Sequence, residues 1–204
     1  MGIMSTSSTV TRLRVLEPAS NTLLSSVPDK LKQFCFHPID DTIEERAWGW
    51  VCFDDMLDNQ WHTAPPEKGE YMFFSLRIDV RRIPGSVLKK ELALAFKDEE
   101  EKNKEQGKKF ISRERKKELK EQARLRLLTR IPPQPTTVDV VWATARGMLY
   151  VTTNSPKTLD LLSEHFTQTF DLHVEPMSPY IMASTKLDET SLAKLDTLEP
   201  AQFA

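Results

Sequence analysis

The stretch that decides the fold runs from Arg82 to Ile131 and reads RIPGSVLKKELALAFKDEEEKNKEQGKKFISRERKKELKEQARLRLLTRI. Apolar residues recur every three or four positions in both of its halves, which is helical spacing. Gly107 interrupts the pattern, and Ser112 is a suitable N-cap for a second helix that ends near Leu128. The stretch therefore predicts two helices that are joined by a short break and are dominated by charged residues.

The sequence on either side alternates short β-prone runs with two further helices. One helix is expected to begin at Pro28 and to end before Pro38, and another to begin at Pro156 after Ser155, because proline suits a first helical position. The segment 132–135 predicts a stiff, polyproline-like exit from the second charged helix. Strands are expected at residues 8–16, 47–53, 71–80, 137–144 and 148–153, with a last one near 172–176.

These elements indicate an α+β protein, with antiparallel sheets, packed helices and a basic, finger-like helical excursion in the middle. Four segments are expected: an N-terminal α+β part at 1–83, the basic helical finger at 84–135, a β-hairpin plus helix that completes the core at 136–183, and a polar tail at 184–204. Cys35 and Cys52 are interpreted as core thiols, and Trp48, Trp50 and Trp142 as core anchors.

Charge is divided unevenly along the chain, although the net formal charge is only −2. Residues 77–130 hold 18 of the 28 Lys and Arg but 10 of the 30 Asp and Glu, a local net of +8. The remainder has a net of −10. The two parts of the molecule therefore carry opposite electric fields, and the basic part is suited to a polyanion.

The basic segment supplies cations of the kind that meet DNA phosphates and release condensed counterions. The second charged helix is expected to gather several of them on one ridge, because they lie three or four residues apart. Glu114 and Glu121 are expected to offset some of the repulsion by pairing with Lys117. The candidate DNA-binding residues are Arg81, Arg82, Lys89, Lys90, Lys108, Lys109, Arg113, Arg115, Lys116, Lys117, Lys120 and Arg124.

A mixed Lys/Glu helix is also compatible with a merely solvated face. A further alternative is a helical hairpin that docks a protein partner, or dimerises, through Leu88, Leu92 and Phe96 on one helix and Leu119, Ala123 and Leu127 on the other. Few aromatic residues interleave with the cations, which favours contact with a duplex backbone over stacking on single-stranded bases.

The stretch 82–131 resembles the bacterial recombination-associated RdgC family in its order of Pro, Val, a Leu-rich helix, EQGKK, and a Lys/Glu helix that ends in a leucine pair. Two flanking features agree with this resemblance. Trp48-Gly49-Trp50-Val51 is similar to that family's Gly-Trp-Val strand. The run from Val141-Trp142 to Met148-Leu149-Tyr150-Val151, followed by Ser155-Pro156-Lys157, is similar to its hairpin and following helix.

The resemblance implies binding of double-stranded DNA with little sequence preference, a homodimer, and restraint of the strand-exchange recombinase by occupation of its DNA. It places the family's basic finger at 89–130. Typical members are longer, so the chain is expected to lack most of their C-terminal portion. The segment 131–135 has no aromatic residue, so a gating role for that loop is not expected to carry over.

Other chemistries find weak support in the residues. A metal-dependent nuclease would need converging carboxylates, for which Asp54, Asp55 and Asp58 are the best candidates, but they fall on one predicted loop. Cysteine and histidine spacings do not fit a zinc site, and no phosphate-binding loop is present. We therefore expect no enzyme, no cofactor and no metal. Without an apolar run of membrane length or a signal-like start, a cytoplasmic, nucleoid-associated protein with no membrane contact is expected.

Overall fold

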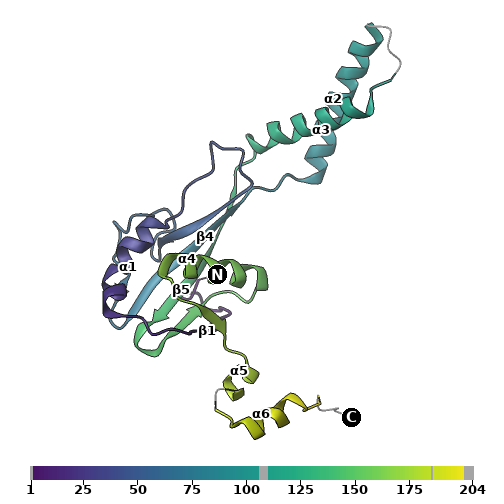
Figure 1. Cartoon of the computed structure of the whole chain (residues 1–204). Coiled ribbons are helices and arrows are strands. Elements are labelled where there is room, and N and C mark those ends of the chain that lie inside the picture. The colour runs from purple at the N-terminus through teal and green to yellow at the C-terminus, as the bar shows by residue number, and fades with distance from the viewer. Residues whose placement is uncertain (1, 106–109, 185, 200–204) are drawn as a thin grey trace. The chain divides into compact units, whose positions relative to one another are not determined.

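The computed structural model describes residues 2–105, 110–184 and 186–199 (Figure 1). Its seven strands form one antiparallel sheet with the order β2-β4-β5-β6-β1-β7, and β3 pairs with β4. The strands are β1 Thr11–Val15, β2 Arg46–Cys52, β3 Glu67–Lys68, β4 Tyr71–Val80, β5 Gln134–Ala143, β6 Met148–Val151 and β7 Val174–Pro176. The helices are α1 Asn21–Gln33, α2 Gly85–Glu105, α3 Arg113–Leu128, α4 Pro156–Phe170, α5 Pro179–Ser184 and α6 Glu189–Asp196, and Thr144–Arg146 is a 3-10 turn. The predicted α+β fold is confirmed.

The chain divides into two compact units. The first comprises Met1–Lys30, Pro65–Phe74 and Val138–Ala204, and the second comprises Leu31–Ala64 and Ser75–Thr137. The four sequence segments given above remain a prediction. No helix within the described ranges is long and apolar enough to cross a bilayer.

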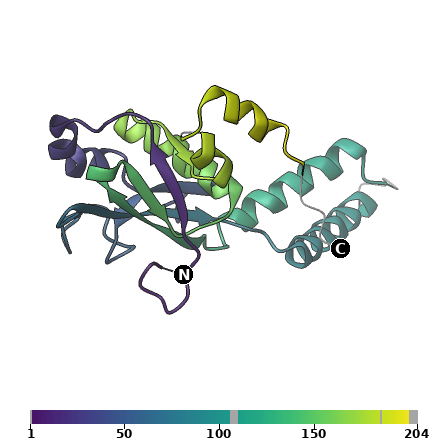
Figure 2. The same ribbon diagram turned by 90° about the horizontal axis from the view of Figure 1, so that it is seen from below.

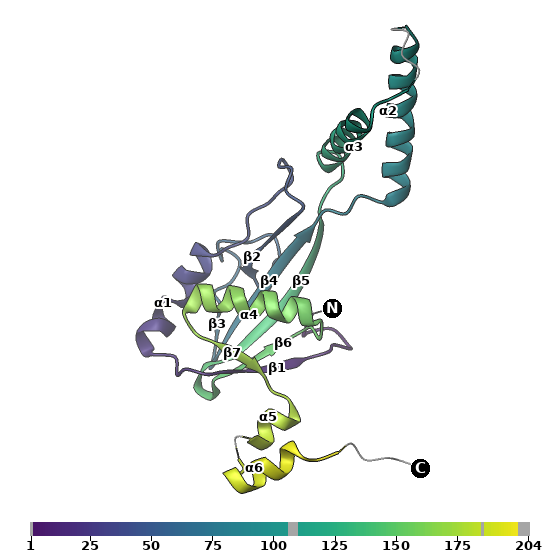
Figure 3. The same cartoon turned by 45° about the vertical axis from the view of Figure 1, so that its right-hand side comes forward.

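The first unit is built around the hairpin of β5 and β6 and the helix α4 (Figure 3). The hairpin turns at Gly147, whose φ of 59° lies in the left-handed region that glycine adopts without strain. It pairs Trp142 with Leu149. The ring of Trp142 lies 5.3 Å from that of Phe166 and 5.4 Å from that of Phe170, and all three side chains are buried. This aromatic cluster fixes α4 against β5, and loss of one such ring costs about 3–5 kcal/mol.

The strand β4 carries buried side chains on both of its faces in the second unit. Leu76 and Ile78 are apolar, whereas the alternate positions Arg77, Asp79 and Arg81 are charged. The guanidinium of Arg77 donates two hydrogen bonds of 2.8 Å to Asp79, whose side chain is 1% exposed. Because side chains alternate across a strand, β4 presents one apolar and one polar face to the interior.

Arg81 is 3% exposed and follows directly on β4. Its guanidinium donates hydrogen bonds of 2.6–3.2 Å to the backbone carbonyls of Ile39, Asp40, Thr42 and Glu44. Its backbone N–H donates to the carbonyl of Glu45. Arg81 therefore binds the acidic loop before β2 at several points between Ile39 and Glu45.

Several expectations from the sequence are corrected by the structure. The first helix begins at Asn21, after Ser20, whose hydroxyl accepts a hydrogen bond from the N–H of Leu23, and Pro28 lies inside it rather than at its start. The polyproline-like exit is shorter than expected, because β5 already begins at Gln134. Trp48 is 40% exposed and is not a core anchor, whereas Trp50 and Trp142 are fully buried.

The cysteines behave as the sequence predicts. Cys35 and Cys52 are both buried and both free. Burial raises the pKa of the Cys35 thiol. Both sulfur atoms are therefore core groups, and burial keeps the Cys35 thiol in its less reactive, protonated form.

Candidate nucleic-acid interface

The basic segment forms a hairpin of two helices, α2 and α3, which pack side by side (Figure 2). Ser112 occupies the N-cap of α3, and its hydroxyl accepts a hydrogen bond of 3.2 Å from the N–H of Arg115. Leu119, Ala123 and Leu127 are buried, which confirms the predicted apolar stripe of α3. Because this stripe is covered within the chain, it is not available as an exposed docking surface.

An ion pair links the two helices of the hairpin. Arg115 of α3 donates two hydrogen bonds, of 2.8 and 3.1 Å, to the carboxylate of Glu99 on α2, and a third of 2.9 Å to Glu118. Hydrogen bonds to Glu99, and secondly to Glu118, raise the pKa of Arg115 above its usual value. Arg115 was a candidate DNA contact, but in the structure its guanidinium is engaged between the helices.

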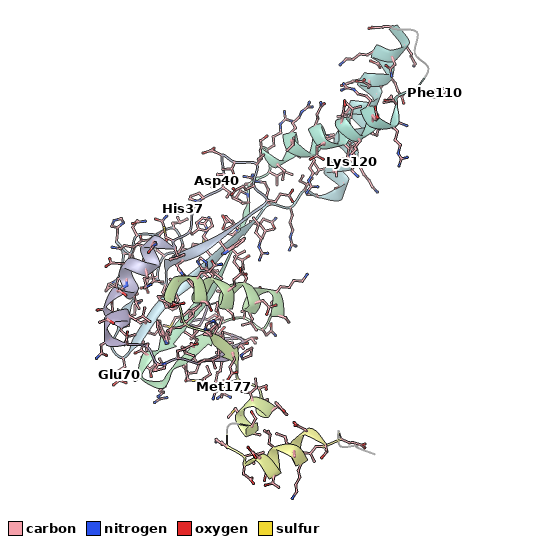
Figure 4. All side chains as sticks on the ribbon, in the orientation of Figure 1. His37, Asp40, Glu70, Phe110, Lys120 and Met177 are labelled. Carbon is pink, nitrogen blue, oxygen red and sulfur yellow. The ribbon has the colours of Figure 1, made fainter. Side chains whose placement is uncertain are left out.

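The remaining cations of α3 gather on one side of the helix. At about 100° per residue, Arg113, Lys117, Lys120 and Arg124 fall within an arc of about 60°. All four are exposed, and Figure 4 shows the side chain of Lys120 among those that extend from α3. We call these four residues the α3 ridge. Lys116 is exposed beside it.

The carboxylates of α3 lie on a different side of the helix from the ridge. Glu114, Glu118 and Glu121 are centred about 100° away around the axis. The expected pairs of Lys117 with Glu114 and Glu121 do not form. Among the described residues no carboxylate pairs with Arg113, Lys117 or Lys120, whereas Arg124 pairs with Glu45. Most of the positive charge of the ridge is therefore free to meet an external anion.

The other candidate residues have different surroundings. Arg82, Lys89 and Lys90 are exposed, but neighbours on a helix project about 100° apart, so Lys89 and Lys90 do not share one face of α2. Arg81 is buried and bound to carbonyl groups, so it is structural in this fold. Lys108 and Lys109, like the predicted helix break at Gly107, lie outside the described residues.

Two of the three loop carboxylates considered for metal binding, Asp55 and Asp58, bind N–H groups of the loop itself. Asp58 accepts hydrogen bonds from the N–H groups of Gln60 and Thr63, at 2.9 and 2.7 Å. Burial raises the pKa of Asp58, but these hydrogen bonds outweigh it and the net shift is downward. Asp55 likewise accepts from the N–H of Leu57. Over the described parts of the chain, no three His, Cys, Asp or Glu side chains are placed to hold a metal ion.

Together these features define an α+β protein that presents a basic helical hairpin with a largely unpaired cationic ridge on α3. The family described as "Putative exonuclease, RdgC" matches residues 13–189. The chain therefore belongs to the RdgC family, as the resemblance of residues 82–131 predicted. Membership of this family fits a recombination-related role for the chain. No curated protein matches the chain.

Proposed function

We propose that the chain binds duplex DNA without sequence preference, through the α3 ridge, and thereby denies that DNA to the strand-exchange recombinase. The observation that supports this most is the set of exposed cations within one arc of α3, three of which have no carboxylate partner among the described residues. Phosphates are spaced regularly along a duplex, so a row of cations can meet several at once. Contacts of this kind carry no sequence information.

The proposal includes a homodimer, a location with nucleoid DNA and the absence of cleavage. The family description names an exonuclease, but two of the three best acidic candidates, Asp55 and Asp58, use their oxygens to bind loop N–H groups. A metal-dependent nuclease would instead direct such oxygens at a shared ion. Occlusion of the duplex needs only the ridge.

Fluorescence anisotropy with two unrelated labelled duplexes, at several salt concentrations, tests the proposal. The variant Arg113→Gln/Lys117→Gln/Lys120→Gln should weaken binding to both duplexes alike and flatten the slope of log K against log salt by about 2.7, at about 0.9 per phosphate contact. The matched control Lys32→Gln/Lys157→Gln/Lys186→Gln removes three exposed cations elsewhere and should leave the slope nearly unchanged.

The result that would overturn DNA binding is no binding of either duplex at low salt. Equal effects of the two triple variants would overturn the role of the ridge, since they would show a response to net charge alone. Incubation of an end-labelled duplex with the protein and Mg²⁺ tests the absence of cleavage, because progressive shortening would contradict it. Solution mass with and without DNA tests the homodimer.

A further inference from the structure

A groove of about 610 Å³ lies where the hairpin of α2 and α3 joins the rest of the second unit. Its apolar lining comes from Val80, Ile83 and Leu88, which are half-buried and so keep part of their surface exposed. A sugar-phosphate backbone would leave these side chains without an apolar partner. Their burial by a ligand requires an apolar group on that ligand.

Cations outnumber carboxylates along the same groove, because its charged lining consists of Arg46, Arg81, Arg82, Lys120 and Arg124 against Glu45 and Glu121. Arg82 and Lys120 are exposed, and neither forms an ion pair with another described residue. Arg81 also lines the groove, but its guanidinium is already bound to carbonyl groups, so the free positive charge comes from its neighbours. An apolar lining edged by free cations is complementary to a ligand that is both apolar and acidic.

The groove already binds one carboxylate of the chain itself. Arg124 donates a hydrogen bond to the side chain of Glu45, and both residues line the groove. Both side chains are 49% exposed, so this pair is accessible to competition from outside. It shows that an acidic side chain of a polypeptide fits this edge of the groove.

We propose that this groove is a docking site for an acidic peptide segment of a partner protein, which carries at least one large apolar side chain. The apolar side chain covers Val80, Ile83 and Leu88, while carboxylates of the peptide meet Arg82 and Lys120. Glu45 competes for Arg124, so the chain weakens the binding of its own ligand. The ridge residue Arg113 does not line the groove, and peptide binding therefore does not depend on it.

The probe is a fluorescein-labelled hexapeptide, Asp-Glu-Leu-Phe-Glu-Asp, and its control is Asp-Glu-Ser-Ser-Glu-Asp, with the same charge. Anisotropy titration of the full chain at about 150 mM salt reduces the contribution of diffuse attraction. The apolar peptide should bind at least about tenfold more tightly than its control, because burial of one Leu or Phe side chain is worth about 1.5–3 kcal/mol.

Lys120 and Arg124 belong to both the ridge and the groove, so four variants at other positions distinguish the two sites. Leu88→Ser should lower the affinity for the apolar peptide by about tenfold, and Arg82→Gln should lower it by a smaller factor. Glu45→Gln should raise the affinity, because it frees Arg124. Arg113→Gln should leave peptide binding within about twofold while it weakens duplex binding. Circular dichroism checks the fold, and if Leu88→Ser is unfolded then Ile83→Ser, outside the helix, replaces it.

Four results would overturn the docking site. The first three are no peptide binding up to about 1 mM, equal binding of the two peptides, and loss of peptide binding in Arg113→Gln. A fourth is a loss of duplex binding in Leu88→Ser as large as the loss of peptide binding, which would assign the groove to nucleic acid. Failure of the ridge variants on duplex DNA would leave the peptide result standing, so the two proposals are tested separately.

Discussion

Substitution of the adjacent residues Arg81 and Arg82 by methionine should change the free energy of unfolding to very different extents. Arg81→Met removes four hydrogen bonds from the guanidinium to carbonyls of the loop before β2. Arg82→Met removes a side chain that is exposed and has no ion-pair partner in the described parts of the chain. The two variants carry the same change in charge and in side-chain chemistry, so each is the control for the other.

The size of the Arg81 effect follows from its hydrogen bonds. Each contributes about 1 kcal/mol net, and loop carbonyls that regain water recover part of the loss, so we expect a destabilisation of about 3 kcal/mol. A loss of this size is a large fraction of a typical folding free energy of about 5–15 kcal/mol. Arg82→Met should cost less than about 0.5 kcal/mol, as substitutions at open surface positions do.

Urea denaturation followed by far-ultraviolet circular dichroism measures both values. At a slope of about 2 kcal/mol per molar urea, Arg81→Met should lower the midpoint by about 1.5 M, while Arg82→Met should not move it measurably. Binding of the acidic peptide under folding conditions should show the reverse order, because Arg82 borders the groove and has no role in the loop. A loss below about 1 kcal/mol for Arg81→Met, or an equal loss for Arg82→Met, would refute the assignment of Arg81 as the residue that holds the loop.

Three further changes have defined outcomes. Asp79→Ala leaves the guanidinium of Arg77 without its buried partner and should cost about 3–5 kcal/mol in urea denaturation. Gly49→Ala would place a Cβ 2.5 Å from the backbone of the segment after α1, so its thermal melting temperature should fall sharply. The backbone N–H of His173 donates to Glu17 and lowers the pKa of that carboxyl below 4.5. Glu17→Gln should therefore lower the melting temperature at neutral pH, and the difference from the wild type should close as the pH falls below 4.5. A difference that persists at low pH would contradict this.

Elements with local signals at both ends were predicted well from the sequence. The strand Tyr71–Val80 has the predicted bounds, and α3 runs from Arg113 to Leu128 behind the predicted N-cap at Ser112. Ser155 does occupy the N-cap of α4, but its side chain makes no capping hydrogen bond. In each case the deciding interactions lie within a few residues, which is the range that a sequence pattern describes.

The first helix was predicted less well because tertiary packing outweighs a local preference there. Proline favours the first turn, yet Pro28 lies inside α1, between the fully buried side chains of Val27 and Leu31. Burial of those two side chains offsets the hydrogen bond that proline cannot donate. The start at Asn21 follows from the cap at Ser20, a weaker signal than the proline.

The charge distribution of the sequence located the candidate interface, but it could not distinguish the exposed, unpaired cations from those that are bound within the fold. Arg115 meets Glu99 from 16 positions away, Arg124 meets Glu45 from 79 positions away, and Arg81 reaches carbonyls about 40 positions upstream. A count of charges treats all three as free cations, because their partners come together only in the fold. The exposure of Trp48 was missed for the same reason, since an aromatic residue in a β-prone run is usually expected inside.

Because charged and apolar side chains alternate along β4, a change in its length by an odd number of residues differs in effect from a change by an even number. Charged and apolar side chains occupy opposite faces, and each face includes buried side chains, such as those of Asp79 and Leu76. A single-residue deletion between positions 75 and 80 would turn the part of the strand on one side of the deletion over, so that its charged side chains face hydrocarbon and its apolar side chains face the polar side. Removal of two residues would keep every remaining side chain on its original face and would only shorten the strand. Related sequences should accordingly tolerate paired gaps in this strand far better than odd ones.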